Sequence, residues 1–232
     1  MMKVIPKVAL LSCVLFASAC APVYVPNVVN APLLSESGEA NLAGYMGSSG
    51  FDFQSSFALT SNIALMANGS FFKDEEEETN EYSEHYFGEG GIGYFRHLGK
   101  SGRMEFFGGY GYGHTKAEDE WYFLGDQSEY AEAFFHRIFI QTNVGITTEY
   151  FNGGFAIRGC CLLFSKYIHN NNTYNEKDAY FFIEPVLFWG LGWQRVKMMS
   201  QVGFSVCFNQ RPINYIPFLV SFGINVNLGR TR

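Results

Sequence analysis

Strict alternation between apolar and polar side chains is the sequence feature that most constrains this fold. Its clearest instance runs from Ile216 to Leu228, where every second residue is a large apolar one and the intervening positions become small or polar after Leu219. Side chains of a β-strand point alternately to opposite faces, so this period of two predicts a long strand with one apolar and one polar face. A slip of one residue would exchange the faces, so the pattern also specifies the register.

Similar alternating runs recur along the chain and predict about ten strands. The predicted strands lie near residues 38–48, 50–60, 62–73, 83–97, 103–116, 133–149, 153–167, 179–195, 198–209 and 213–229. A number of about eight remains open if the first hairpin or another weak pair does not form.

Short and long connections alternate between these runs. Those near 60–62, 98–102, 151–153 and 195–198 are short, whereas those near 73–83, 117–131 and 168–178 are long and polar. In an up-and-down arrangement the long connections share one end of the molecule, which is typical of barrels that span a membrane. The acidic run Asp74–Glu78 lies in one of them and is predicted to be a solvated loop rather than a cation site.

Composition narrows the class of protein. Aromatic residues make up 18% of the chain and there are 25 glycines, whereas charged residues reach only 16%, against an average of about 25%. Beyond the N-terminal region no apolar run approaches the about 18 residues of a membrane-spanning helix. The combination predicts an all-β fold, an antiparallel up-and-down transmembrane β-barrel. The formal net charge of −6 argues against nucleic acid as a partner.

Charged residues fall on the polar face of five predicted strands: Glu89, Glu105, Arg137, Arg158 and Glu184. The opposite faces are nearly all Phe, Ile, Leu, Val and Trp. A soluble barrel with this polar face inside would bury many charges, whereas a membrane barrel gives them a lumen that is wet or in which they pair with one another. Two roles for this network stay open. It could filter or plug a narrow pore, or it could fill and stabilise a closed barrel.

Tyrosines mostly fall near predicted strand ends, where aromatic girdles are expected at the two membrane interfaces. The set comprises Tyr86, Tyr94, Tyr110, Tyr112, Tyr122, Tyr130, Tyr150, Tyr167, Tyr174, Tyr180 and Tyr215. The glycines of the run from Gly108 to Gly113 alternate in part with tyrosines inside a strand, which predicts tight packing there rather than a nucleotide-binding loop.

The N-terminus has the layout of a secretory signal peptide. Lys3 and Lys7 precede the apolar stretch Val8–Phe16, and the small residues Ala17-Ser18-Ala19 stand directly before Cys20. We predict a signal peptide over 1–19 and lipidation of Cys20, with ordinary signal-peptide cleavage as the alternative. Residues 20–37 contain three prolines and no periodicity, so they are predicted to be a lipid anchor in the periplasmic leaflet and an extended tether ahead of a barrel domain over 38–232.

No catalytic or metal-binding motif is recognisable. The five histidines show no metal-ligand spacing, and no ordered Ser/His/acid triad stands out. Cys160 and Cys161 are adjacent and point to opposite faces of a strand, so they are expected to remain thiols, although a disulfide from one of them to Cys207 stays open. We therefore expect a protein that is not an enzyme and has neither a cofactor nor a metal.

The Ala17-Ser18-Ala19-Cys20 sequence, the proline-bearing segment and the alternating strands up to Leu228 together resemble a small Gram-negative outer-membrane β-barrel lipoprotein. The resemblance is architectural and implies outer-membrane lipid and an N-terminal acyl anchor as partners, with a structural or narrow-pore role. The chain departs from many such barrels in ending on Arg232 rather than on an aromatic residue. Two alternatives stay open: a soluble lipid-anchored barrel that binds an apolar ligand, and a lipid-modifying barrel enzyme.

Overall fold

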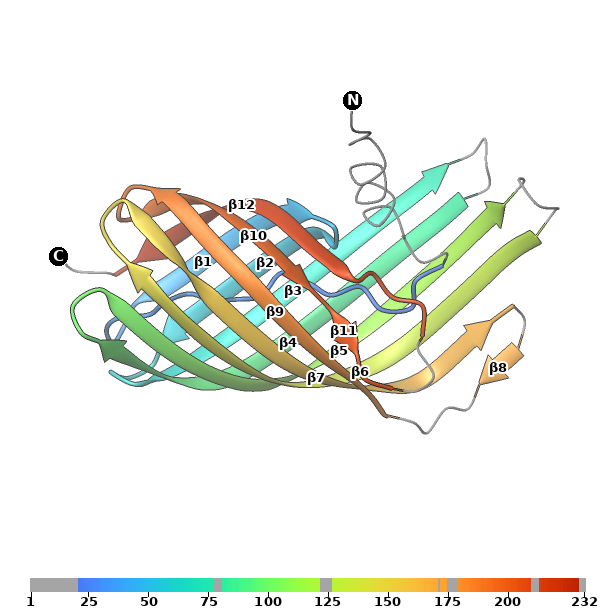
Figure 1. The fold of residues 1–232 in the computed structure, drawn as a ribbon, viewed down its shortest axis with the longest axis horizontal. Helices are drawn as coiled ribbons and strands as arrows, with labels where there is room; N and C mark the ends of the chain where they lie inside the picture. Colours follow the sequence, from blue (N-terminus) through green and yellow to red (C-terminus); the bar gives the residue numbers. More distant parts are fainter. Residues whose placement is uncertain are drawn as a thin grey trace, which may run out of the picture.

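The computed structural model describes residues 21–76, 81–121, 127–170, 172–174, 179–209 and 213–229, and Figure 1 shows its ribbon. The predicted signal peptide over 1–19, Cys20, Tyr122 and the end of the acidic run, Glu77 and Glu78, lie outside these residues. Within the described ranges, no helix is long and apolar enough to cross a bilayer.

The described chain forms one antiparallel sheet that closes on itself. Its strands are β1 (Ala40–Gly47), β2 (Gly50–Ala58), β3 (Ile63–Glu76), β4 (Glu81–Leu98), β5 (Gly102–Trp121), β6 (Gln127–Thr147), β7 (Phe151–His169), β8 (Asn172–Tyr174), β9 (Ala179–Gly192), β10 (Val196–Phe204), β11 (Val206–Cys207) and β12 (Phe218–Leu228). The ring runs from β1 through β7 to β9, β10 and β12, and β12 pairs with β1. The two-residue β11 pairs with the start of β9, and β8 pairs with the end of β7. The prediction of a ten-stranded antiparallel barrel is therefore confirmed.

The two ends of the barrel differ, but the long connections predicted over 73–83 and 117–131 are wrong: most of these residues extend β3 to β6, and Asp74 to Glu76 of the predicted acidic loop belong to β3. The end formed by the connections 59–62, 99–101, 148–150 and 193–195 is called the short-turn end, and β1 starts and β12 finishes there. At the opposite end, called the long-hairpin end, strands β3 to β7 project beyond the rest of the wall (Figure 1, right). β4 to β7 are 18 to 21 residues long, whereas β1 and β2 have 8 and 9.

The outward face of the barrel is apolar and the inward face is largely polar. Phe53, Ile140 and Leu191 are 61%, 72% and 62% exposed, whereas Asp52 and Gln54 on either side of Phe53 are buried in the lumen. The predicted register is thus correct. Tyr86, Tyr94, Tyr110, Tyr112 and Tyr150 lie on the exposed outer face, as expected of an aromatic girdle. Three of the tyrosines assigned to that girdle, Tyr167, Tyr180 and Tyr215, instead pack against the buried core.

Residues 21–37, called the inner segment, correct the prediction of a tether outside the fold: they run extended through the lumen (Figure 1, blue). Val23, Tyr24, Val28, Val29, Leu33 and Leu34 are all 0% exposed. These apolar side chains gain free energy by burial, roughly 1.5–3 kcal/mol for each large one. The three prolines of the segment have no N–H, so they remove three donors that the lumen would otherwise have to satisfy.

Inward glycines of β5 make room for bulky side chains of the neighbouring strands. A Cβ added to Gly109 would lie 2.6 Å from the Phe139 ring, and one added to Gly113 would lie 2.5 Å from the Phe135 ring. At Gly111 an added Cβ would meet Phe87 at 2.6 Å and the Cβ of Glu89 at 2.8 Å. The glycine-rich run therefore packs tightly in the barrel wall, as its sequence predicts.

Candidate functional site: the sealed lumen

Four of the five predicted lumen charges lie together. Arg158 on β7 and Glu184 on β9 are Cα partners, and Arg158 Nε donates to Glu184 Oε2 at 2.7 Å. Arg137 on β6 donates to Glu89 on β4, and Arg158 Nη1 lies 3.8 Å from Glu89 Oε1. All four side chains are at most 1% exposed. Two acids and two bases therefore balance one another out of contact with bulk solvent, as burial of charge requires.

Gly111 explains how Glu89 and Arg137 reach each other across an intervening strand. Glu89 is the Cα partner of Gly111 on one side of β5, and Arg137 is its partner on the other. Any side chain at that position would occupy the space between them. The ion pair between Glu89 and Arg137 therefore depends on Gly111, which lies two strands from Arg158. No local sequence motif reveals this dependence.

The inner segment inserts two polar side chains into this charge network. Tyr24 Oη donates to Glu184 Oε1 at 2.7 Å and accepts from Arg137 Nη1 at 3.0 Å. The Tyr24 side chain is fully buried, so its hydroxyl makes both hydrogen bonds inside the lumen.

Asn27 occupies the centre of the network. Its Oδ1 accepts from Arg137 Nη2 at 2.6 Å, and its backbone carbonyl accepts from Arg158 Nη2 at 2.9 Å. Its Nδ2 donates to Glu89 Oε1 at 3.3 Å. Asn27 therefore contacts both arginines and one of the two carboxylates, while Arg137 Nε and Arg158 Nη1 stay buried without a hydrogen-bond partner among the described residues.

Glu105 does not join the network, contrary to the grouping that its inward face suggested. It accepts from the backbone N–H of Leu34 and from Asn143 Nδ2, both at 2.8 Å. Asn143, its Cα partner on β6, is six residues from Arg137, about 20 Å along a strand. Glu105 instead holds the far end of the inner segment, close to the short-turn end.

Side-chain amides of the wall replace a β-strand partner for the inner segment. Gln201 accepts from the backbone N–H of Val29 at 3.2 Å and donates to its carbonyl at 2.8 Å. Gln54 donates to the carbonyl of Val28 and Gln141 to that of Asn30, both at 2.7 Å. Gln54 and Gln141 stand on the polar faces of alternating runs in the sequence, a pattern that indicates no ligand for them. The ligand is the chain's own backbone.

The described residues contain no group of three or more His, Cys, Asp or Glu side chains suited to a metal ion. Cys160, Cys161 and Cys207 are free thiols. Cys160 is buried beside Glu184 in the lumen, with 3.7 Å between its Sγ and Glu184 Oε2.

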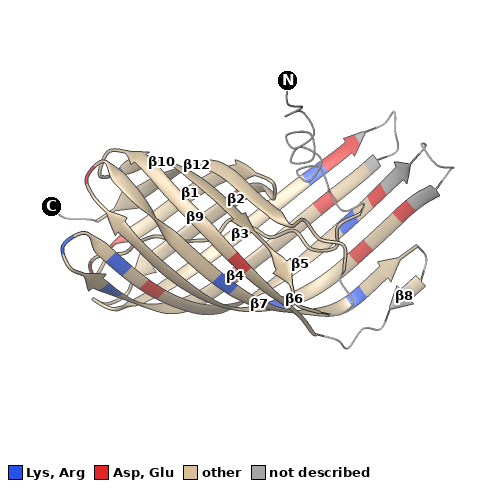
Figure 2. Cartoon of the chain, in the orientation of Figure 1, with Lys and Arg blue, Asp and Glu red and all other residues tan. Residues whose placement is uncertain are grey.

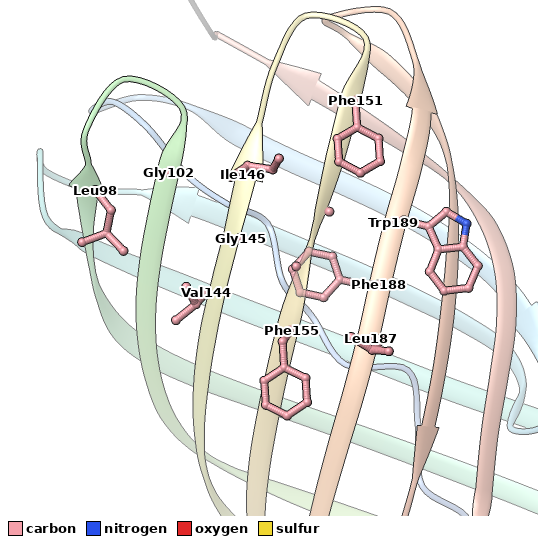
Figure 3. A pocket seen from close by; sticks show the side chains of 12 residues that line it. Leu98, Gly102, Val144, Gly145, Ile146, Phe151, Phe155, Leu187, Phe188 and Trp189 are labelled. Atoms are coloured by element: carbon pink, nitrogen blue, oxygen red, sulfur yellow. The ribbon is translucent and has the colours of Figure 1, made fainter.

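An apolar groove of about 630 Å³ lies in the outer wall near the short-turn end (Figure 3). Phe151, Phe155, Leu187 and Trp189 border it on one side, and Leu98, Val144 and Ile146 border it on the other. Gly145, Gly153 and Gly154 leave its floor low, so the ring of the inward-facing Phe188 lies within reach. A hydrocarbon chain fits the chemistry of this lining.

No protein-family model matches this chain, and no curated protein sequence does either. Among solved structures, the fold is similar to the translocator domain of the autotransporter NalP from Neisseria meningitidis. The two share 9% sequence identity with a TM-score of 0.45, and the match covers 81% of this chain and 86% of that one. The geometry on its own defines the class: a closed β-barrel with an apolar exterior and a lumen filled by the chain's own N-terminal segment.

Proposed function

We propose that this protein is an outer-membrane β-barrel whose lumen is sealed by the inner segment and whose role is structural. The observation that carries the proposal is the apolar outer face, which continues over all ten strands of the ring. Monomeric soluble proteins rarely expose more than a few hundred Å² of contiguous apolar surface. A lipid bilayer covers such a belt, so the outward residues then incur no cost of contact with water.

A change of chemistry along the outer face marks one edge of the belt. Tyr86 on β4 and Tyr112 on β5 are exposed aromatic residues of the belt. Nearer the long-hairpin end, His114 on β5 lies between two acidic side chains of the neighbouring strands. Its Nδ1 is 3.7 Å from Glu84 Oε1, and its Nε2 is 3.4 Å from Glu132 Oε1. Figure 2 shows charged residues on the projecting ends of β3 to β6. Because such barrels have short periplasmic turns and longer external loops, the proposal places the long-hairpin end outside the cell.

Lipid anchoring is part of the proposal. The small residues ahead of Cys20 and the basic, apolar start of the chain support a signal peptide over 1–19 and acylation of Cys20. Outer-membrane lipid is then the partner of both the belt and the anchor. Catalysis and cofactors have no part in the proposed role, and an unchanged lipid A profile in a strain lacking the protein would agree with that.

The soluble alternative, a lipid-anchored barrel that binds an apolar ligand, receives less support. Such a barrel needs an apolar cavity inside and a polar face outside. Here the described inner segment occupies the lumen and the apolar side chains point outward.

Heat-modifiability tests the proposal. The outer-membrane fraction is run on SDS gels with and without boiling, and a faster-migrating unboiled band that only detergent extracts is the expected result. A Cys20→Ala variant serves as the control for anchoring. If this variant is released into buffer and shows no mobility shift, the protein is not a membrane barrel.

A further inference from the structure

The direction in which the inner segment crosses the lumen is set by contacts at its two ends. Near its start, the backbone N–H of Val23 donates to the carbonyl of Asn214 at 2.9 Å, and Tyr24 forms a parallel bridge with Tyr215. Residues 214 and 215 lie in the connection between β11 and β12, at the long-hairpin end. The inner segment therefore begins at the long-hairpin end.

The other end of the inner segment is fixed at the short-turn end. Ser35 Oγ accepts from Arg103 Nε at 2.9 Å, and the Ser35 carbonyl contacts His97 Nε2 at 2.7 Å. His97 and Arg103 flank the turn 99–101 that joins β4 to β5. The chain thus crosses the whole barrel between Val23 and Ser35 and then enters β1 in the reverse direction.

Ala21 is the first described residue of the inner segment and lies next to the residues that contact the connection between β11 and β12. Ala21 is fully buried in a core cluster that includes Val23, Tyr24 and Ile213. Fully buried side chains of the inner segment fill the lumen between Ala21 and the short-turn end, so the described chain enters the barrel from the long-hairpin side.

We infer that the protein displays its mature N-terminus at the cell surface, so that an acyl group on Cys20 enters the outer leaflet rather than the periplasmic one. The inference rests on the proposed function, which supplies the membrane and its orientation. The C-terminal end of β12 lies at the short-turn end, which the proposed orientation places in the periplasm. The two ends of the mature chain are therefore on opposite sides of the membrane, although β1 and β12 are neighbours.

Two tagged variants test this inference. One carries an alanine and a short epitope inserted directly after Cys20, which keeps an alanine next to the cysteine, and the other carries the same epitope after Arg232. Antibody is applied to intact cells and to permeabilised cells. We expect the N-terminal epitope to be stained on intact cells, at least tenfold above background, and the C-terminal epitope to be stained only after permeabilisation.

Heat-modifiability of both tagged proteins separates the two ideas. If the shifted band persists but the N-terminal epitope is stained only after permeabilisation, the threading direction is wrong and the barrel stands. If both epitopes are stained on intact cells, the assignment of opposite sides is wrong. Loss of the shifted band in the untagged protein as well overturns the proposed function, and the inference with it.

Discussion

Arg158 and Glu184 face each other as Cα partners on β7 and β9, and their side chains meet inside the lumen with 2.7 Å between Nε and Oε2. The pair is part of a four-charge network that also contacts Tyr24 and Asn27 of the inner segment. The strand register of the barrel and the sealing of its lumen are therefore properties of one hydrogen-bonded network.

Removal of one charge from this network is expected to destabilise the barrel strongly. An Arg158→Met variant leaves Glu184 buried without its nearest cation, and breaking a buried pair in this way costs about 3–5 kcal/mol. The urea concentration at which the heat-modifiable band is half lost measures the effect. The double variant R158M/E184L removes both charges and should lose less than R158M alone. Unfolding of R158M at the wild-type urea concentration would contradict the prediction.

Gly111 is expected to be intolerant of even a methyl group. In Gly111→Ala the new Cβ would lie 2.6 Å from the Phe87 ring and 2.8 Å from the Cβ of Glu89, so the wall must shift. Overpacking of this kind costs about 1–3 kcal/mol. Gly88→Ala on the neighbouring strand is the matched control, because nothing lies within 4 Å of its added Cβ. Equal urea midpoints for the two variants would contradict the prediction, because they would show that the lumen accommodates a methyl group at position 111.

Deletion of residues 22–35 should convert a closed barrel into a conducting one. The wild-type protein is expected to give no steady current in planar bilayers, because fully buried side chains fill the lumen. The deletion leaves Glu105, Arg137 and Arg158 in a wet channel. Only deletion protein that retains the heat-modifiable band is assayed, and Tyr24→Phe, which keeps the ring in place, serves as a closed control. A wild-type protein that conducts as well as the deletion variant would show that the inner segment does not seal the lumen.

A charge placed on the outer belt distinguishes lipid from water as the surroundings of the barrel. Ile140 is 72% exposed on the outer face of β6, and arginine there is expected to destabilise a membrane barrel by about 2–4 kcal/mol. Glu118→Arg, on an outward position of β5 beyond the aromatic girdle, should change stability by less than about 1 kcal/mol. Folding in vesicles, followed by gel mobility, measures both. A neutral effect of I140R would favour the soluble alternative.

The strands were predictable because alternation reports directly which side of the wall each residue faces. That rule places four charged residues on the inner face: Glu89, Arg137, Arg158 and Glu184. Their positions along the barrel axis depend on strand stagger, which alternation does not report. Alternation alone therefore groups Glu105 with residues that lie about 20 Å away. Tyr180 was misassigned for a related reason. Its position at a strand end suggests the aromatic girdle, but its place in the alternation of the strand puts its side chain on the inner face of the barrel.

The inner segment was not predictable from local pattern. Prolines and lack of periodicity in residues 21–37 describe an external tether as well as a chain that threads a lumen. The contacts that distinguish the two are remote, such as that between Asn27 and Arg137, 110 positions apart. The segment's valines and leucines, in an otherwise tether-like stretch, are the only local signal.

The seam between β1 and β12 pairs residues 40–47 with residues 221–228, and the inner segment is joined directly to β1. If the barrel closed first, the inner segment would have to enter it afterwards, and the side chains that line the lumen leave no passage for it. The order of assembly is therefore constrained: the inner segment must lie inside the barrel before β12 pairs with β1. Closure of the seam then traps the inner segment, and its release requires the barrel to open.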